Sequence, residues 1–129
     1  MNPEQTPSEA GRFDTLALDP KLLAAVADSG YTSMTPIQAK AIPLVIDGRD
    51  VMGAAQTGTG KTAAFTLPLL QRMLKHENDS ASPARHPVRA LVLTPTRELA
   101  VQVADSVAKY AKRTNLRSMV VFGGVDMKP

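Results

Sequence analysis

The sequence predicts an α/β fold, a parallel sheet covered by helices on both faces. Three observations support this prediction. Short apolar runs at residues 50–54, 88–94 and 118–122 have the composition of strands, segments with helical spacing of apolar residues alternate with them, and a glycine-rich loop joins the first run to a helix. Strands that alternate with helices are typical of a parallel sheet. The chain has 129 residues, 43% of them hydrophobic, which is enough for one domain with its own core.

Two helices are predicted before the glycine-rich loop, because a capping residue followed directly by proline occurs twice. Asp19 starts the first helix, which should end at Gly30, and Thr35 starts the second. Pro43 falls inside the second helix and is expected to kink or divide it, since proline lacks the amide hydrogen that a helix interior uses. Further helices are predicted from the loop to about Leu74 and from Thr96 to about Thr114.

The glycine-rich loop at residues 55–62, Ala-Gln-Thr-Gly-Thr-Gly-Lys-Thr, has the features of a phosphate-binding loop. Gly58 and Gly60 permit a tight curl of backbone N–H groups around phosphates. Lys61 supplies a cation for the terminal phosphates and Thr62 a hydroxyl for Mg²⁺. The strict pattern begins with glycine, where this chain has Ala55. The alternative is a glycine turn with a lysine on the solvent face of a helix, but the predicted strand before the loop and helix after it favour nucleotide binding.

Composition narrows the class of protein. The formal net charge of +3 and a pI near 9.5 are compatible with a polyanionic partner without requiring one. The chain has no cysteine, which excludes disulfides and thiolate metal sites, and His76 and His86 lie in a polar stretch typical of solvated loops. No apolar run reaches membrane-spanning length and no signal peptide is recognised, so a cytoplasmic location is expected. Residues 1–12 are expected to form a disordered tail.

Three further segments identify a family. Residues 30–38 read Gly-Tyr-Thr-Ser-Met-Thr-Pro-Ile-Gln with Phe13 upstream, residues 95–100 read Pro-Thr-Arg-Glu-Leu-Ala, and residues 123–124 are a glycine pair. Together with the phosphate loop, these segments resemble the opening half of a DEAD-box ATP-dependent RNA helicase, most closely the bacterial RhlE-type members. In that family the loop commonly begins with alanine, which agrees with this chain. The resemblance implies that residues 13–129 form an incomplete first RecA-like domain.

The resemblance implies specific roles in ATP binding. Gln38 carries an amide donor and acceptor that suit the N6 and N7 edge of adenine and would select ATP over GTP. Phe13 resembles the family's aromatic residue that stacks on the base, and Tyr31 is a second contact. Without the resemblance, Gln38 would be an ordinary polar helix residue and Phe13 an ordinary packing residue. The implied cofactors are ATP and Mg²⁺. The implied site comprises Phe13, Tyr31, Gln38, Gln56, Thr57, Gly58, Thr59, Gly60, Lys61 and Thr62, with Lys61 and Thr62 catalytic and Thr62 holding Mg²⁺.

The resemblance also implies a second site, which binds the RNA backbone. Pro95, Thr96 and Arg97 lie where a predicted strand meets a helix, so N–H groups, a hydroxyl and a guanidinium could hold phosphate there. Gly123 and Gly124 would let the sugar–phosphate chain approach closely. Such contacts do not depend on base sequence. From the residues alone, a simple turn with Arg97 paired to Glu98 or solvent is an equal alternative. The basic cluster after this site is expected to be a solvated helix end: Lys109, Lys112, Arg113 and Arg117.

Hydrolysis would need further parts. A triphosphatase of this kind uses an acidic pair to hold Mg²⁺ and orient water, and no Asp-Glu dipeptide occurs in the chain. The family's Ser-Ala-Thr motif and second domain are also absent, so the sequence is interpreted as truncated before the acidic Walker B strand. The piece alone is expected neither to hydrolyse ATP efficiently nor to unwind duplexes. A complete, non-catalytic nucleotide- or RNA-binding module, or a gene remnant, remains the alternative. A different P-loop enzyme is disfavoured by Gln38 and residues 95–100.

Overall fold

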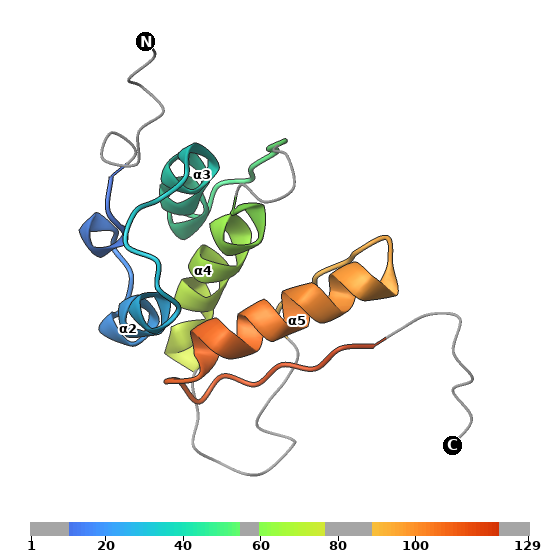
Figure 1. Cartoon of the computed structure of the whole chain (residues 1–129). Coiled ribbons are helices and arrows are strands. Elements are labelled where there is room, and N and C mark those ends of the chain that lie inside the picture. The colour runs from blue at the N-terminus through green and yellow to red at the C-terminus, as the bar shows by residue number, and fades with distance from the viewer. Residues whose placement is uncertain (1–10, 55–59, 77–88, 122–129) are drawn as a thin grey trace, which may run out of the picture.

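A computed structural model describes residues 11–54, 60–76 and 89–121. In this part of the chain, α4 lies at the centre, with α3 packed along it and α5 crossing its carboxyl-terminal half (Figure 1). The end of α5 also contacts α2. No helix among the described residues is long and apolar enough to cross a bilayer. The elements are η2 (Phe13–Thr15), α2 (Pro20–Asp28), α3 (Pro36–Ile46), α4 (Lys61–Met73), η3 (Leu74–His76) and α5 (Arg97–Ala111).

Side-chain caps define the predicted helix starts. The carboxylate of Asp19 accepts a hydrogen bond from the Lys21 N–H at 2.9 Å, and the Thr96 hydroxyl accepts one from the Leu99 N–H at 3.1 Å. Thr35 begins α3 with a capping box, described with the site below. Each cap satisfies an N–H group that the first helical turn leaves without a backbone partner. The sequence prediction of these three starts is therefore confirmed to within a residue.

Pro43 does not divide α3, because the helix runs from Pro36 to Ile46; of the two expected effects, a division is excluded and a kink stays a prediction. Proline in a helix interior removes one backbone hydrogen bond, and Pro43 lies in the last part of the helix, where few bonds follow it. The carbonyl of Pro43 still accepts the Asp47 N–H at 3.0 Å. The helix therefore continues past the proline and ends one turn later.

The core lies where α2, α3, α4 and α5 meet. Leu22, Ile42 and Leu67 are almost completely buried, one from each of α2, α3 and α4. Phe13 and Tyr110 complete the cluster from η2 and from the end of α5. Burial of such side chains stabilises the fold by roughly 1.5–3 kcal/mol each. The core thus fixes the position of the segments that enter and leave these helices.

The three predicted strands are not formed within the described residues. Residues 50–54, 89–94 and 118–121 are irregular there, and the only strand-type pairing in the described ranges is a bridge between Arg12 and Ser33. The described part therefore does not show the expected sheet, although residues 88 and 122 lie outside it. A strand exists only by hydrogen bonding to a neighbouring strand, and these three segments do not pair with one another.

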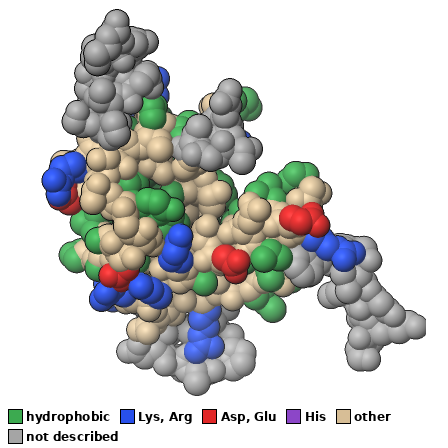
Figure 2. All heavy atoms as spheres, viewed as in Figure 1, with side chains coloured by type: hydrophobic (Ala, Val, Ile, Leu, Met, Phe, Trp, Pro, Cys, Tyr) green, Lys and Arg blue, Asp and Glu red, His purple; other side chains and the backbone are tan. Residues whose placement is uncertain are grey.

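As a consequence, apolar side chains of these segments reach the surface. Figure 2 shows such side chains near the amino-terminal end of α5. Alternate residues of an extended segment point to opposite faces, so pairing and packing on both faces would be needed to bury them. The large hydrophobic side chains exposed in these segments are Val51, Met52, Leu91, Val92, Leu93, Met119, Val120 and Val121.

Candidate nucleotide-binding site

Gln38 joins the start of α3 to the start of α4. Its side chain is only 6% exposed, and its Oε1 accepts a hydrogen bond from the Thr35 N–H at 2.9 Å. Its Nε2 donates to the carbonyl oxygen of Gly60 at 3.0 Å, across 22 residues of sequence. The residue predicted to recognise adenine therefore touches the last glycine of the predicted phosphate loop.

The Gln38 amide keeps binding capacity after these two bonds. A primary amide has two N–H donors and an oxygen that accepts two hydrogen bonds. The bonds to Thr35 and Gly60 use one donor and one acceptor position. One N–H and one lone pair are what the N7 and N6 edge of adenine requires. The two bonds in the structure also fix the orientation of the amide, which would otherwise be free to rotate.

Gly60 is the residue on which α4 begins, and its backbone is left-handed with a φ of 83°. A Cβ atom there would collide with the Gln38 side chain, lying 2.9 Å from Cδ and closer still to Nε2. Only glycine therefore allows this turn and this contact together. Unlike α2, α3 and α5, α4 has no side-chain cap, so its first N–H groups are not bonded to a capping side chain.

Lys61 and Thr62 occupy the first turn of α4. Lys61 is exposed and Thr62 is half-buried. The amino-terminal end of a helix carries partial positive charge and attracts anions, so a lysine at this point adds to the attraction. The rest of the predicted phosphate loop lies outside the described residues: Ala55, Gln56, Thr57, Gly58 and Thr59.

Gly11 and the first residue of η2, Phe13, hold the loop between α2 and α3. The Phe13 N–H donates to the Thr32 carbonyl at 3.2 Å, and the Met34 N–H donates to the Gly11 carbonyl at 2.9 Å. The Phe13 ring is 3% exposed and belongs to the core, while Tyr31 is 45% exposed. Stacking of Phe13 on a base stays a prediction, since the ring is packed inside. The loop lines an open hollow of about 400 Å³: Gly30, Tyr31, Thr32, Ser33, Met34, Thr35 and Pro36.

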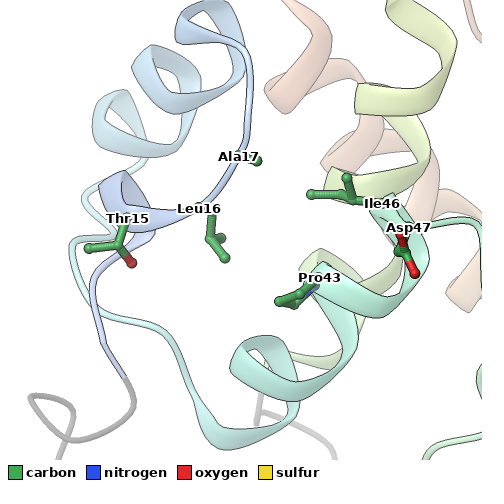
Figure 3. A pocket seen from close by; sticks show the side chains of 6 residues that line it. All are labelled: Thr15, Leu16, Ala17, Pro43, Ile46 and Asp47. Carbon is green, nitrogen blue, oxygen red and sulfur yellow. The ribbon is translucent and has the colours of Figure 1, made fainter.

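A second hollow, of about 360 Å³, lies between the chain after η2 and the end of α3 (Figure 3). It contains none of the residues predicted to bind nucleotide or RNA. Its one acidic group, Asp47, pairs with Arg49 at 3.2 Å. Its chemistry does not suit a phosphate, so the hollow next to Gln38 is the better nucleotide candidate. The second hollow is lined by Thr15, Leu16, Ala17, Pro43, Ile46 and Asp47.

The predicted RNA-contacting residues lie at the start of α5, at the end of that helix away from α2 (Figure 1). Pro95 and Arg97 are exposed. The Thr96 hydroxyl caps the helix, and its carbonyl accepts a hydrogen bond from the Thr94 hydroxyl at 3.1 Å. Gly123 and Gly124 lie outside the described residues, so the structure brings together only the first half of this site.

Two residues of the basic cluster at the end of α5, Lys112 and Arg113, pair with α2, while their side chains stay about half exposed to solvent. Arg113 Nη2 and Nε lie 2.8 and 2.9 Å from Oδ2 of Asp28, and Lys112 Nζ lies 3.0 Å from the same oxygen. Hydrogen bonds from Arg113 and then Lys112 hold the pKa of Asp28 below its ordinary value. Lys109 lies over the rings of Tyr31 and Tyr110. Sequence patterns could not show these contacts, because Asp28 and Arg113 are 85 residues apart.

Known proteins match this arrangement. A model of the DEAD/DEAH box helicase family matches residues 35–129, which include the capping box, the phosphate loop and α5. The chain belongs to this family. The resemblance based on residues 30–38, 55–62 and 95–100 is confirmed at the level of the family. The finer similarity to RhlE-type members stays a prediction.

Several curated relatives are similar over most of the chain. It is 51% identical over 113 residues to the ATP-dependent RNA helicase SrmB of Escherichia coli, covering 88% of this chain and 24% of that protein. It is 46% identical to the DEAD-box ATP-dependent RNA helicase RhpA of Helicobacter pylori, covering 90% of this chain and 22% of that protein. The chain therefore spans about a quarter or less of the length of these relatives.

Solved structures agree with the fold assignment. The chain is 34% identical to a DEAD box protein from Methanococcus jannaschii, with a TM-score of 0.73 over 90% of this chain and 30% of that one. It is 38% identical to the RNA helicase Prp28 from Chaetomium thermophilum bound to ADP, with a TM-score of 0.75 over 91% of this chain and 28% of that one. The described fold therefore corresponds to part of a RecA-like helicase domain.

Proposed function

We propose that this chain is the nucleotide-binding part of a DEAD-box ATP-dependent RNA helicase, in which ATP binding and hydrolysis are coupled to the separation of RNA duplexes. The observation that carries the proposal is the hydrogen bond from Gln38 to Gly60, because it joins the predicted base-recognition residue to the predicted phosphate loop. The relatives named as ATP-dependent RNA helicases support the activity. The similarity to a helicase structure with bound ADP supports the choice of nucleotide.

The residues present fit ATP with Mg²⁺. Gln38 would bind the adenine edge, with Tyr31 beside it and Phe13 from the core side. Lys61 and the uncapped first turn of α4 would hold the β- and γ-phosphates, together with the N–H groups of residues 57–60. The hydroxyl of Thr62 would bind Mg²⁺, which neutralises charge that develops on the phosphates.

We propose that Pro95, Thr96 and Arg97 bind RNA phosphates together with the glycine pair at residues 123–124. The amino-terminal end of α5 and the exposed Arg97 offer positive charge without base recognition. We also propose that residues 50–54, 88–94 and 118–122 are strands of a parallel sheet in the RecA-like domain. Their exposed apolar side chains support this, since strands buried on both faces are rich in such residues.

Calorimetry of the chain with ATP, ADP and GTP in the presence of Mg²⁺ tests the nucleotide site. ATP and ADP should bind more tightly than GTP, roughly ten- to a hundred-fold, the discrimination expected of one bidentate base contact. Lys61→Ala should abolish binding. The matched control is Lys40→Ala, which removes an exposed lysine from α3 and should bind like the wild type. Equal affinity for ATP and GTP, or unchanged binding in Lys61→Ala, would refute the site.

A turnover assay tests the expectation about hydrolysis. The pure chain should show no RNA-stimulated release of phosphate from ATP, because no Asp-Glu pair is present in its sequence to orient water at a bound Mg²⁺. The control is the same assay on a sample with catalytic amounts of a complete DEAD-box helicase added. Turnover by the pure chain above that of Lys61→Ala would contradict the expectation.

A further inference from the structure

The carboxyl-terminal end of α5 contacts the loop that lines the candidate base-binding hollow. Lys109 Nζ lies 5.5 Å from the centre of the Tyr31 ring and 5.4 Å from the centre of the Tyr110 ring. Burial first, and then interaction with Tyr31, raise the pKa of Tyr110 to about 12. A cation this close to two aromatic rings is attracted by the negative face of each. Three side chains from two distant parts of the sequence therefore form one cluster.

Tyr110 and Tyr31 have unequal surroundings. Tyr110 is 3% exposed and belongs to the core, so its ring has a fixed position. Tyr31 is 45% exposed and sits in the loop between α2 and α3, where it lines the hollow of about 400 Å³. The lysine that lies over both rings therefore ties the exposed side chain of Tyr31 to the fixed ring of Tyr110.

The other side of the loop is held independently. Backbone hydrogen bonds from Phe13 and Met34 attach it to the start of η2 and the residues before it, and the capping box attaches its end to α3. The backbone of Tyr31 is held as well, because its N–H donates to the Val26 carbonyl at 3.2 Å, whereas its side chain lies against Lys109 of α5. Loss of the α5 contact should therefore release the side chain of Tyr31 without releasing the backbone of the loop.

We infer that Tyr110 and Lys109 are positioning residues for nucleotide binding, which hold Tyr31 at the mouth of the hollow where the base would lie. This inference rests on the proposed function. Neither residue lines the hollow, so both would act through Tyr31. An ordered side chain at the site loses less conformational freedom when a ligand binds, and so increases affinity.

Nucleotide affinity in a double-mutant cycle tests the inference. Tyr110→Phe and Tyr31→Phe each remove one hydroxyl of the tyrosine pair and should each weaken ATP binding by roughly three- to ten-fold, the size of one net polar interaction. The double variant should bind no more weakly than either single variant, because both changes remove the same interaction. Additive effects, or an affinity unchanged in both single variants while the wild type binds, would overturn the inference.

Two lysine variants that remove the same charge distinguish the inference from a purely structural effect. Lys109→Met and Lys112→Met each remove one cation from the exposed end of α5, but only Lys109 lies over the tyrosine rings. Lys109→Met should weaken ATP binding at an unchanged melting temperature, and Lys112→Met should bind like the wild type. Equal effects of the two variants would overturn the inference.

Tyrosine fluorescence supplies a direct signal from the cluster. The chain has two tyrosines, Tyr31 and Tyr110, and no tryptophan, so all tyrosine emission comes from this pair. Saturating Mg²⁺ and ATP should change the emission of the wild type with the same midpoint as the calorimetric titration. Emission that stays constant while calorimetry shows binding would overturn the inference alone. A wild type that binds no nucleotide in either assay would overturn the proposed function and the inference with it.

Discussion

The loop around Gln38 and the chain on either side of α5 differ in what holds them in place. Around Gln38, polar groups of three segments bond one another, and Phe13 anchors the loop in the core. On either side of α5, residues 89–94 and 116–121 form no strand in the described structure and expose leucine, valine and methionine. The comparison teaches that the described part of the candidate nucleotide site is held by polar bonds and by the core, whereas the surface beside the candidate RNA site has apolar area still to be covered.

Replacing one leucine in each region by alanine should give the largest difference between the two regions in the free energy of unfolding. Leu22 is completely buried in the core, whereas Leu93 is 83% exposed. Leu22→Ala should lower the free energy of unfolding by roughly 2–5 kcal/mol, since it removes buried methyl groups and leaves a cavity. Leu93→Ala should change it by less than about 0.5 kcal/mol. Urea unfolding followed by circular dichroism measures both. Similar losses in the two variants would mean that residues 89–94 are buried in solution.

Two glycines near Gln38 in sequence or in space, Gly60 and Gly30, both have a left-handed backbone and provide a second comparison. They have φ angles of 83° and 85°, but a Cβ on Gly60 would strike Gln38, whereas one on Gly30 meets nothing within 4 Å. Gly30→Ala should cost roughly 1–2 kcal/mol for the backbone conformation alone. Gly60→Ala should cost more and should also abolish nucleotide binding, because Gln38 must move away. Melting curves and ATP titrations distinguish the two effects, and equal behaviour would show that the contact between Gln38 and Gly60 is unimportant.

The difference between local and long-range contacts explains which features the sequence could predict. Helix starts at Asp19, Thr35 and Thr96 depend on groups two or three residues away, so local patterns predict them. The contact of Gln38 with Gly60 and that of Lys109 with the Tyr31 ring depend on how helices pack, which no local pattern contains. Strand formation at residues 50–54, 88–94 and 118–122 depends on neighbours far away in sequence, and there the prediction and the described structure differ.

Ionisation of Tyr110 tests how firmly α5 is joined to the organised region. Burial first, and then the charge and hydrogen bond of Tyr31, raise the pKa of Tyr110 from 10.0 to about 12. Between these values the unfolded chain has lost the proton and the folded chain has kept it, so stability falls as pH rises through this range. Thermal melts at rising pH should fall less steeply in Tyr110→Phe, and parallel curves would contradict the raised pKa.

The ion pairs of Asp28 should produce the smallest effect, because all three side chains are accessible to solvent and surface pairs contribute little. Arg113 and then Lys112 lower the pKa of Asp28 from 3.8, so the stabilisation is complete above that value and is lost as pH falls through the lowered pKa. Asp28→Asn should therefore melt slightly below the wild type at neutral pH, and the difference should vanish in acid and shrink in high salt. Asp105→Asn, on the exposed side of α5, is the matched control and should melt like the wild type at every pH. A difference for Asp28→Asn that persists in acid would mean that the aspartate acts through packing, and that α5 is joined to α2 by the core and the tyrosine pair alone.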